Sequence, residues 1–168
     1  MRKIVPILFV AAAAFSLSAC NKDENKPAEA VAEQAVQHVP VPTDANDKAA
    51  WKAYLKNTLS ANANLLKGSI TPYYVPGGED EAAQADRNNQ LDNVKLVVAR
   101  SVLPNNTLAF GGPDSAKTAE LITEAFKEAS PGSFKDVIVI FIGSAGDGEA
   151  VKQALAPSGA TVHVIEAK

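Results

Sequence analysis

Cys20 is the only cysteine among the 168 residues of this chain, and its thiol is the side chain best suited to covalent chemistry. The residues before it are typical of an export signal. Arg2 and Lys3 form a short basic region, and residues 4–17 are mostly apolar. This apolar stretch is shorter than the roughly 20 residues that a membrane-spanning helix needs. We therefore interpret residues 1–19 as a secretory signal and exclude them from the prediction of the fold.

The stretch Leu17-Ser18-Ala19-Cys20 resembles the lipobox of bacterial lipoproteins, in which small residues precede a cysteine. The resemblance implies a diacylglycerol thioether on Cys20, cleavage just before it, and acylation of the freed amine by a fatty acid such as palmitate. This chemistry requires a thiolate nucleophile. Two or three acyl chains hold a protein at a bilayer almost irreversibly, since each buried CH₂ contributes about 0.8 kcal/mol. The alternative is an ordinary secretory signal followed by an incidental cysteine.

Asn21 follows the cysteine and bears on sorting between membranes. In lipoproteins of bacteria with two membranes, Asp at this position commonly retains the protein in the inner membrane. The resemblance therefore implies that Asn21 allows transfer to the outer membrane, on its periplasmic face. Once Cys20 carries lipid, the exported sequence has no disulfide, thiol nucleophile or thiolate metal site.

Two glycine-containing segments could bind a phosphate or another small ligand, because each is expected to follow a strand and precede a helix. Residues 143–148 have the spacing Gly-x-x-Gly-x-Gly, which matches neither glycine fingerprint, and Asp147 would repel an anion. Residues 111–118 contain a Lys-Thr pair without the Walker spacing, and helix capping explains Asp114 and Ser115. For the 143–148 glycines, the alternative is a turn that needs positive φ. The candidate ligand residues are Gly111, Gly112, Ser115, Gly143, Ser144, Gly146 and Gly148.

Ser144, Asp147 and His163 occur in the chain order of a hydrolase triad. A nucleophile elbow would, however, need glycine where Ile142 stands, and His163 lies within a predicted strand. We therefore expect no catalytic residue and interpret His163 as part of the sheet.

Metal ligands are also not expected. The other histidine, His38, lies in a segment predicted to be flexible, so a two-histidine site is unfavourable. Four nearby carboxylates could hold a weak Ca²⁺ but lack EF-hand spacing. They are Glu79, Asp80, Glu81 and Asp86. We predict no metal and no cofactor.

Tyr73 and Tyr74 are the candidate partner-binding residues. They lie in residues 70–78, where two prolines and two adjacent glycines predict a loop. An amphipathic ring with a polar tip suits a protein interface. The alternative is that both rings fold over the edge of the core.

The sequence after Cys20 divides into a tether and one domain. Residues 20–43 are rich in charged residues, Ala, Gln and Pro and contain no aromatic residue, which predicts a flexible segment. Such a tether spans roughly 25–30 Å. Residues 44–168 are long enough for a single domain with its own core. Without residues 1–19 the chain has 14 basic and 19 acidic residues, a net charge of −5 that disfavours nucleic-acid binding.

Hydrophobic periodicity predicts the elements of this domain. An amphipathic helix capped by Asp44 or Asp47 runs to about residue 67, with Trp51, Tyr54 and Leu55 on its buried side. We expect further helices at 79–91, 113–130 and 149–156, strands at 94–103, 137–142 and 161–165, and a short strand or extended loop at 107–110. Strands that alternate with helices predict the α/β class. We expect a small three-layer domain with a mostly parallel sheet and the N-terminal helix packed on it.

These features suggest two hypotheses for function. The first is a lipid-anchored, non-catalytic periplasmic lipoprotein that binds another protein, either an envelope component or an incoming toxin or effector. Its membrane contact would be the N-terminal lipid. The second is a small-molecule, nucleotide or phosphate-binding α/β domain, or a weak hydrolase, that uses the two glycine segments.

Overall fold

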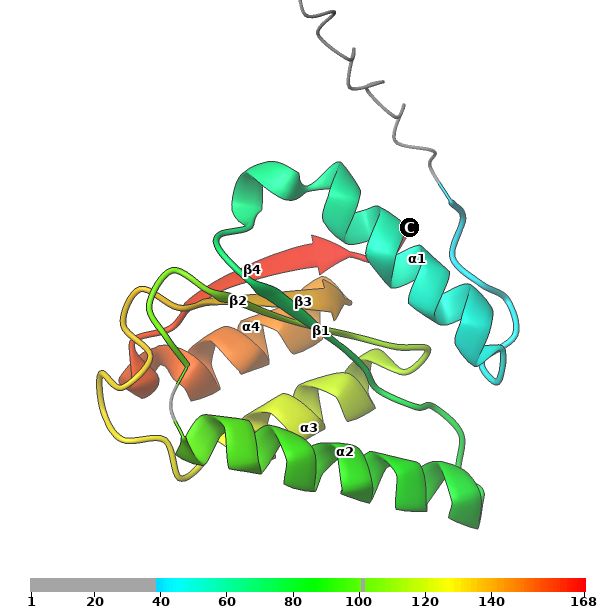
Figure 1. Ribbon diagram of the computed structural model, residues 1–168. Helices are drawn as coiled ribbons and strands as arrows, with labels where there is room; N and C mark the ends of the chain where they lie inside the picture. The colour runs from blue at the N-terminus through cyan, green and yellow to red at the C-terminus, as the bar shows by residue number, and fades with distance from the viewer. Residues whose placement is uncertain (1–38, 101) are drawn as a thin grey trace, which may run out of the picture. The chain divides into compact units, whose positions relative to one another are not determined.

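The computed structural model describes residues 39–100 and 102–168, all of which belong to one compact unit. Four parallel strands form one sheet in the order β1-β2-β3-β4 (Figure 1). The strands are β1 (Ile70–Tyr74), β2 (Thr107–Gly111), β3 (Ile138–Gly143) and β4 (Thr161–Glu166). The helices are α1 (Lys48–Ala61), α2 (Glu81–Ala99), α3 (Ser115–Phe126) and α4 (Ala145–Leu155), with short 3₁₀ helices η1 (Ala63–Leu65) and η2 (Ala156–Ser158). The predicted α/β class and parallel sheet are confirmed.

The sheet separates two hydrophobic layers of unequal size. Helices α2, α3 and α4 cover one face and α1 covers the other (Figure 1). Each strand pairs with the next strand in the chain, so the sheet grows in one direction. Because the crossover connections all have the same handedness, their helices all lie on the same face of the sheet. The strand order therefore never reverses. In open α/β sheets, ligands bind in the crevice that forms where the strand order reverses. This sheet has no such reversal and therefore no such crevice.

The continuous apolar run at 138–142 lies in β3, an interior strand of the sheet. Ile138, Ile140 and Ile142 pack toward α1, whereas Val139 and Phe141 pack toward the three crossover helices. All five side chains are buried because both faces of the sheet are covered. The predicted strands at 137–142 and 161–165 are confirmed. Of the two alternatives for 107–110, a short strand or an extended loop, the strand forms and is β2.

Helix α1 begins where expected and packs through its predicted stripe, but it ends at Ala61, before the predicted end at about residue 67. The carboxylate of Asp47 accepts hydrogen bonds from the backbone N–H groups of Ala49 and Ala50, at 3.1 and 2.9 Å. Trp51, Tyr54, Leu55 and Leu59 are buried against the sheet. Val39 and Val41, at the end of the segment expected to be a tether, are partly buried against the same cluster.

The prediction of a strand at 94–103 is wrong, because this stretch continues the preceding helix as far as Ala99. Leu91, Val94 and Val98 recur at helical spacing, and all three pack against the larger core. Leu96 points away and is 55% exposed. A run of apolar residues fits a buried strand and a half-buried helix equally well.

Two predicted loops are also wrong. Residues 70–74 form the edge strand β1, where Pro72 is tolerated because its nitrogen faces away from β2. The expected glycine loop at 143–148 is instead the end of β3 followed by the first turn of α4. Ser144 caps that helix by accepting a hydrogen bond from the backbone N–H of Asp147 at 3.2 Å. Across the described residues, no helix is both long enough and apolar enough to cross a bilayer.

Candidate functional site

Strand β1 leaves one of its edges open. Thr107 donates its N–H to Ser69 and Val75 donates to Gly111, each at 2.9 Å, so odd-numbered residues of this segment face β2. The backbone groups of Ile70, Pro72 and Tyr74 consequently face outward. Among residues 39–100 and 102–168, no strand pairs with this edge. Pro72 has no N–H at the centre of the open edge, which disfavours the addition of another strand here.

The two candidate tyrosines lie on this strand and point to opposite faces of the sheet. Tyr73 packs on the side of the three crossover helices and stacks on Phe110, with ring centroids 4.9 Å apart. Tyr74 packs on the α1 side. Both are partly buried, and burial raises the pKa of each phenol. They therefore flank the open edge from two sides and do not form one aromatic surface.

A hollow of about 160 Å³ lies beside Tyr74, between the N-terminal ends of α1 and α2. Lys48 and Asp86 also line the hollow and form an ion pair that joins the two helices. Hydrogen bonding to Asp86 raises the pKa of Lys48. The hollow is smaller than the roughly 300 Å³ at which ligand pockets usually begin.

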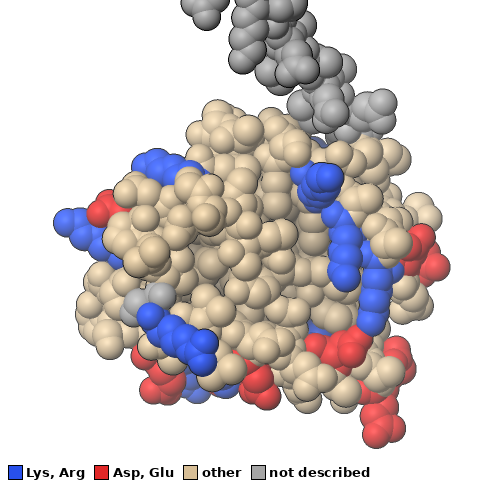
Figure 2. Space-filling model, in the orientation of Figure 1, with Lys and Arg blue, Asp and Glu red and all other residues tan. Residues whose placement is uncertain are grey.

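Charged residues lie around the periphery of the face that contains β1. Figure 2, viewed from the same side as Figure 1, shows an uncharged area over the middle of this face. Ile70 on β1 is 43% exposed. Scarcity of charge with accessible aromatic and aliphatic side chains is typical of the centre of a protein interface.

The predicted ligand residues cluster where strands β2 and β3 end. Ser115 and Ser144 both donate hydrogen bonds to the same oxygen of Asp147, at 2.6 and 2.7 Å. Ser115 Oγ also accepts the backbone N–H of Ser144 at 2.7 Å. The hydrogen bonds from the two hydroxyls lower the pKa of Asp147, and the bond from Ser115 has the larger effect. A carboxylate of the chain itself thus occupies the position between two helix N-termini that an anion would take.

The glycines at this edge serve close packing. A Cβ on Gly112 would lie 2.0 Å from the carbonyl oxygen of Val75, and one on Gly143 would lie 2.5 Å from Ser115 Oγ. Gly111 and Gly148 approach Leu55 and Val164 in the same way, whereas Gly146 faces open space. The glycines with positive φ are elsewhere, so the expected turn at 143–148 is wrong. They are Gly68, Gly78, Gly132 and Gly159.

The remaining candidates are separated in space. His163 pairs with Ile140 in the sheet, three positions before the register at which Gly143 meets Glu166, and the Ser144 hydroxyl is bound to Asp147. Of the acidic residues, Asp80 caps α2, Glu79 pairs with Lys117 and Asp86 with Lys48. Within the described residues no cluster of histidine and carboxylate side chains could hold a metal. Cys20 and Asn21 lie outside the described residues.

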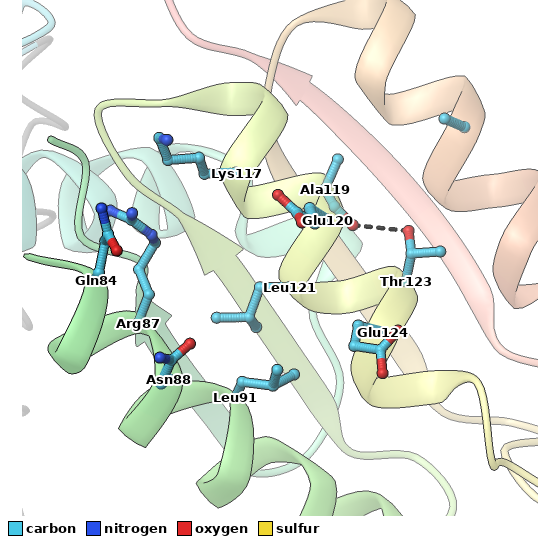
Figure 3. A pocket seen from close by; sticks show the side chains of 11 residues that line it. Gln84, Arg87, Asn88, Leu91, Lys117, Ala119, Glu120, Leu121, Thr123 and Glu124 are labelled. Atoms are coloured by element: carbon cyan, nitrogen blue, oxygen red, sulfur yellow. Dashed lines mark hydrogen bonds between the residues drawn. The ribbon is translucent and has the colours of Figure 1, made fainter. Parts of the chain in front are cut away.

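A groove of about 630 Å³ between α2 and α3 was not anticipated (Figure 3). The groove is lined from α2 by Gln84, Arg87, Asn88 and Leu91 and from α3 by Lys117, Glu120, Leu121 and Glu124. Thr123 also lines it but points away from α2 (Figure 3). The helical spacing of the α2 residues is visible in the sequence. The sequence does not show that α2 packs beside α3. At one end, Arg87 Nη1 lies 3.2, 3.0 and 2.8 Å from the carbonyl oxygens of Pro76, Gly77 and Gly78. This side chain holds the segment that follows β1.

Comparison with known protein families, with curated sequences and with solved structures finds no match to this chain.

Proposed function

We propose that this chain is a lipid-anchored lipoprotein of the bacterial envelope that acts, without catalysis, by binding another protein at the β1 face. The lipid would be carried by Cys20, the only cysteine, and Asn21 would direct the mature protein to the periplasmic face of the outer membrane. The partner would be an envelope component or an incoming toxin or effector.

The observation that carries the protein-binding part is the uncharged face around the open edge of β1 (Figure 2). Ile70 provides apolar contact area on β1, and the partly exposed Tyr74 adds an amphipathic ring beside the Lys48–Asp86 ion pair. Because Pro72 interrupts the row of outward N–H groups, the contact would be made by side chains more than by strand addition.

The alternative, a small-molecule, nucleotide or phosphate-binding domain or a weak hydrolase, is less well supported by the geometry. Asp147 fills the space between the N-termini of α3 and α4, and Ser115 and Ser144 are already bound to it. With no reversal of strand order, the sheet also lacks the usual crevice. A thermal-shift screen with nucleotides, sugars and inorganic phosphate tests this alternative, and a reproducible rise in melting temperature would favour it over protein binding.

Site-specific photo-crosslinking in intact cells tests the proposed surface. A photoreactive residue at position 70 or 74 of the full chain should capture a discrete protein partner. The same residue at position 153, in place of the exposed Gln153 on α4, is the matched control and should not capture it. Equal capture from the two faces, or none from either, would contradict the proposal.

The anchor has a separate test. Detergent phase separation should place the wild-type protein in the detergent phase and the Cys20→Ser variant in the aqueous phase. Mass spectrometry of the mature N-terminus should show the diacylglycerol mass on Cys20. An unmodified sulfur would refute the anchor and leave the protein-binding surface untouched.

A further inference from the structure

The opposite edge of the sheet, strand β4, lacks the proline that protects the β1 edge. Thr161 donates its N–H to Val137 at 2.9 Å and Ala167 donates to Gly143 at 3.2 Å, so odd-numbered residues of β4 face β3. The N–H and C=O groups of Val162, Val164 and Glu166 therefore face outward. No strand among the described residues pairs with them.

Strand β4 lacks the proline and lysine that commonly prevent edge pairing, and its one charged residue, Glu166, lies at its end. Its sequence, Thr-Val-His-Val-Ile-Glu, contains no proline, no lysine and no glycine, and most of its side chains are β-branched. The central four residues are only partly buried. By contrast, β1 carries Pro72 at an outward position. One edge is thus protected and the other is open to pairing.

A groove lies beside one end of β4. Its volume is about 540 Å³, and it runs along the end of β4 that includes Val164, Ile165 and Glu166. Its walls come from both helical layers, with Asn62 and Leu65 on the α1 side and Ala145 and Glu149 on the α4 side. An added strand would continue the sheet between these walls.

We propose that β4 pairs antiparallel with β4 of a second copy of this chain, giving a two-fold symmetric dimer with a continuous sheet. A two-fold axis beside Val164 places Val162 of one copy opposite Glu166 of the other. This register uses all three outward-facing residues of each strand and forms about six N–H···O bonds, two for each facing pair.

The charges on β4 are compatible with self-pairing. Glu166 is the only formally charged residue of the strand and is paired with Lys168 at 2.9 Å. The antiparallel register places the two Glu166 side chains at opposite ends of the paired segment, each facing a neutral valine. No like charges are therefore brought together, so the same segment serves as both partners.

Cysteine cross-linking tests the pairing and its register in residues 35–168, the compact unit that contains both cores and lacks Cys20. The proposed axis places position 161 opposite position 167 of the second copy, in a non-hydrogen-bonded pair whose Cα atoms are about 4.5 Å apart, within disulfide range. Both residues are exposed, so substitution should not disturb the fold. In a mixture of the Thr161→Cys and Ala167→Cys variants, mild oxidation should yield the mixed dimer at least fivefold over either homodimer. Thr71→Cys on the β1 edge is the control for random collisions, and it should yield less disulfide-linked dimer than the mixture does.

Sedimentation equilibrium of the same unit gives the dissociation constant. Val162→Pro removes an outward N–H without breaking a bond to β3, and thus gives β4 the protection that Pro72 gives β1. It should raise the dimer dissociation constant at least tenfold, while far-UV circular dichroism remains that of the wild type. Should this variant fail to fold, the cysteine experiment decides alone. A wild-type unit that stays monomeric at all concentrations, or cross-linking no better than the Thr71→Cys control, would overturn the proposal.

Discussion

Ser115 Oγ donates a 2.6 Å hydrogen bond to the carboxylate of Asp147, which is 32 positions away in the chain. The bond joins the first residue of α3 to the first turn of α4. It also orders the carboxyl edge of the sheet, because Ser144 donates to the same oxygen. The hydroxyl groups of Ser115 and Ser144 and the carboxylate of Asp147 are thus bound to one another and have a structural role.

Replacing Ser115 with alanine should lower the free energy of unfolding by about 1 kcal/mol, the typical net value of one hydrogen bond. Urea unfolding of the wild type and the variant measures the difference. Ser133→Ala is the matched control, since among the described residues its hydroxyl bonds only to Ser130, in an exposed turn. If both substitutions have the same small effect, the bridge between α3 and α4 does not stabilise the fold.

Acid should weaken the contribution of Asp147. Its folded-state pKa is lowered below the ordinary value of 3.8 by the hydroxyls of Ser115 and Ser144. The stabilisation is therefore fully present above the unfolded-state pKa and is lost as the pH falls through the folded-state pKa. The difference in unfolding free energy between wild type and Asp147→Asn should be constant from pH 7 to 5 and shrink below about pH 4. A difference that grows on acidification would show that the sign of the shift is wrong; Asp92→Asn, at an exposed site, is the control.

Two glycines in α4 should respond oppositely to alanine. A Cβ on Gly148 would lie 2.5 Å from Val164 Cγ2, so Gly148→Ala should push α4 away from β4 and cost about 1–3 kcal/mol. A Cβ on Gly146 meets nothing within 4 Å, so Gly146→Ala should be neutral or raise stability by up to about 1 kcal/mol. Melting temperatures of the two variants check this, and equal shifts would contradict the close approach at Gly148.

The extent of α2 predicts which of its apolar residues matter. Val94 is fully buried, so Val94→Ala should lower the free energy of unfolding by about 2 kcal/mol. Leu96→Ala should change it by less than about 0.5 kcal/mol, because this side chain is 55% exposed. In a strand covered on both faces both substitutions would be costly, so chemical denaturation distinguishes the helix from the strand that the sequence predicts.

Arg87 should control the order of the segment after β1. Lysine retains the charge but cannot present the guanidinium to the carbonyl oxygens of Pro76, Gly77 and Gly78. Arg87→Lys should therefore speed amide hydrogen exchange at residues 77–80 roughly fivefold, equivalent to about 1 kcal/mol of local stability. Arg100→Lys, at the exposed end of α2, is the control. Unchanged exchange in Arg87→Lys would mean that the carbonyl contacts do not hold this segment.

The sequence alone determines the elements whose patterns are complete within a short stretch. The continuous run at 138–142 specifies a buried strand, and the helical spacing of Ala119, Ile122 and Phe126 specifies the buried face of α3. Strand–helix alternation then gives the α/β class. These patterns are local, because neighbouring residues of one element show which side is buried.

Tertiary structure decides what depends on pairing between distant segments. The run at 94–103 is compatible with strand or helix, and only packing of Val94 and Val98 on the larger core selects the helix. Residues 70–74 become a strand because β2 supplies their hydrogen bonds, and that pairing sends Tyr73 and Tyr74 to opposite faces. Hydrogen bonds and contacts between residues far apart in the chain leave no periodic trace in either partner, so strand order, the open edges and the Ser115–Asp147 bridge are visible only in the folded molecule.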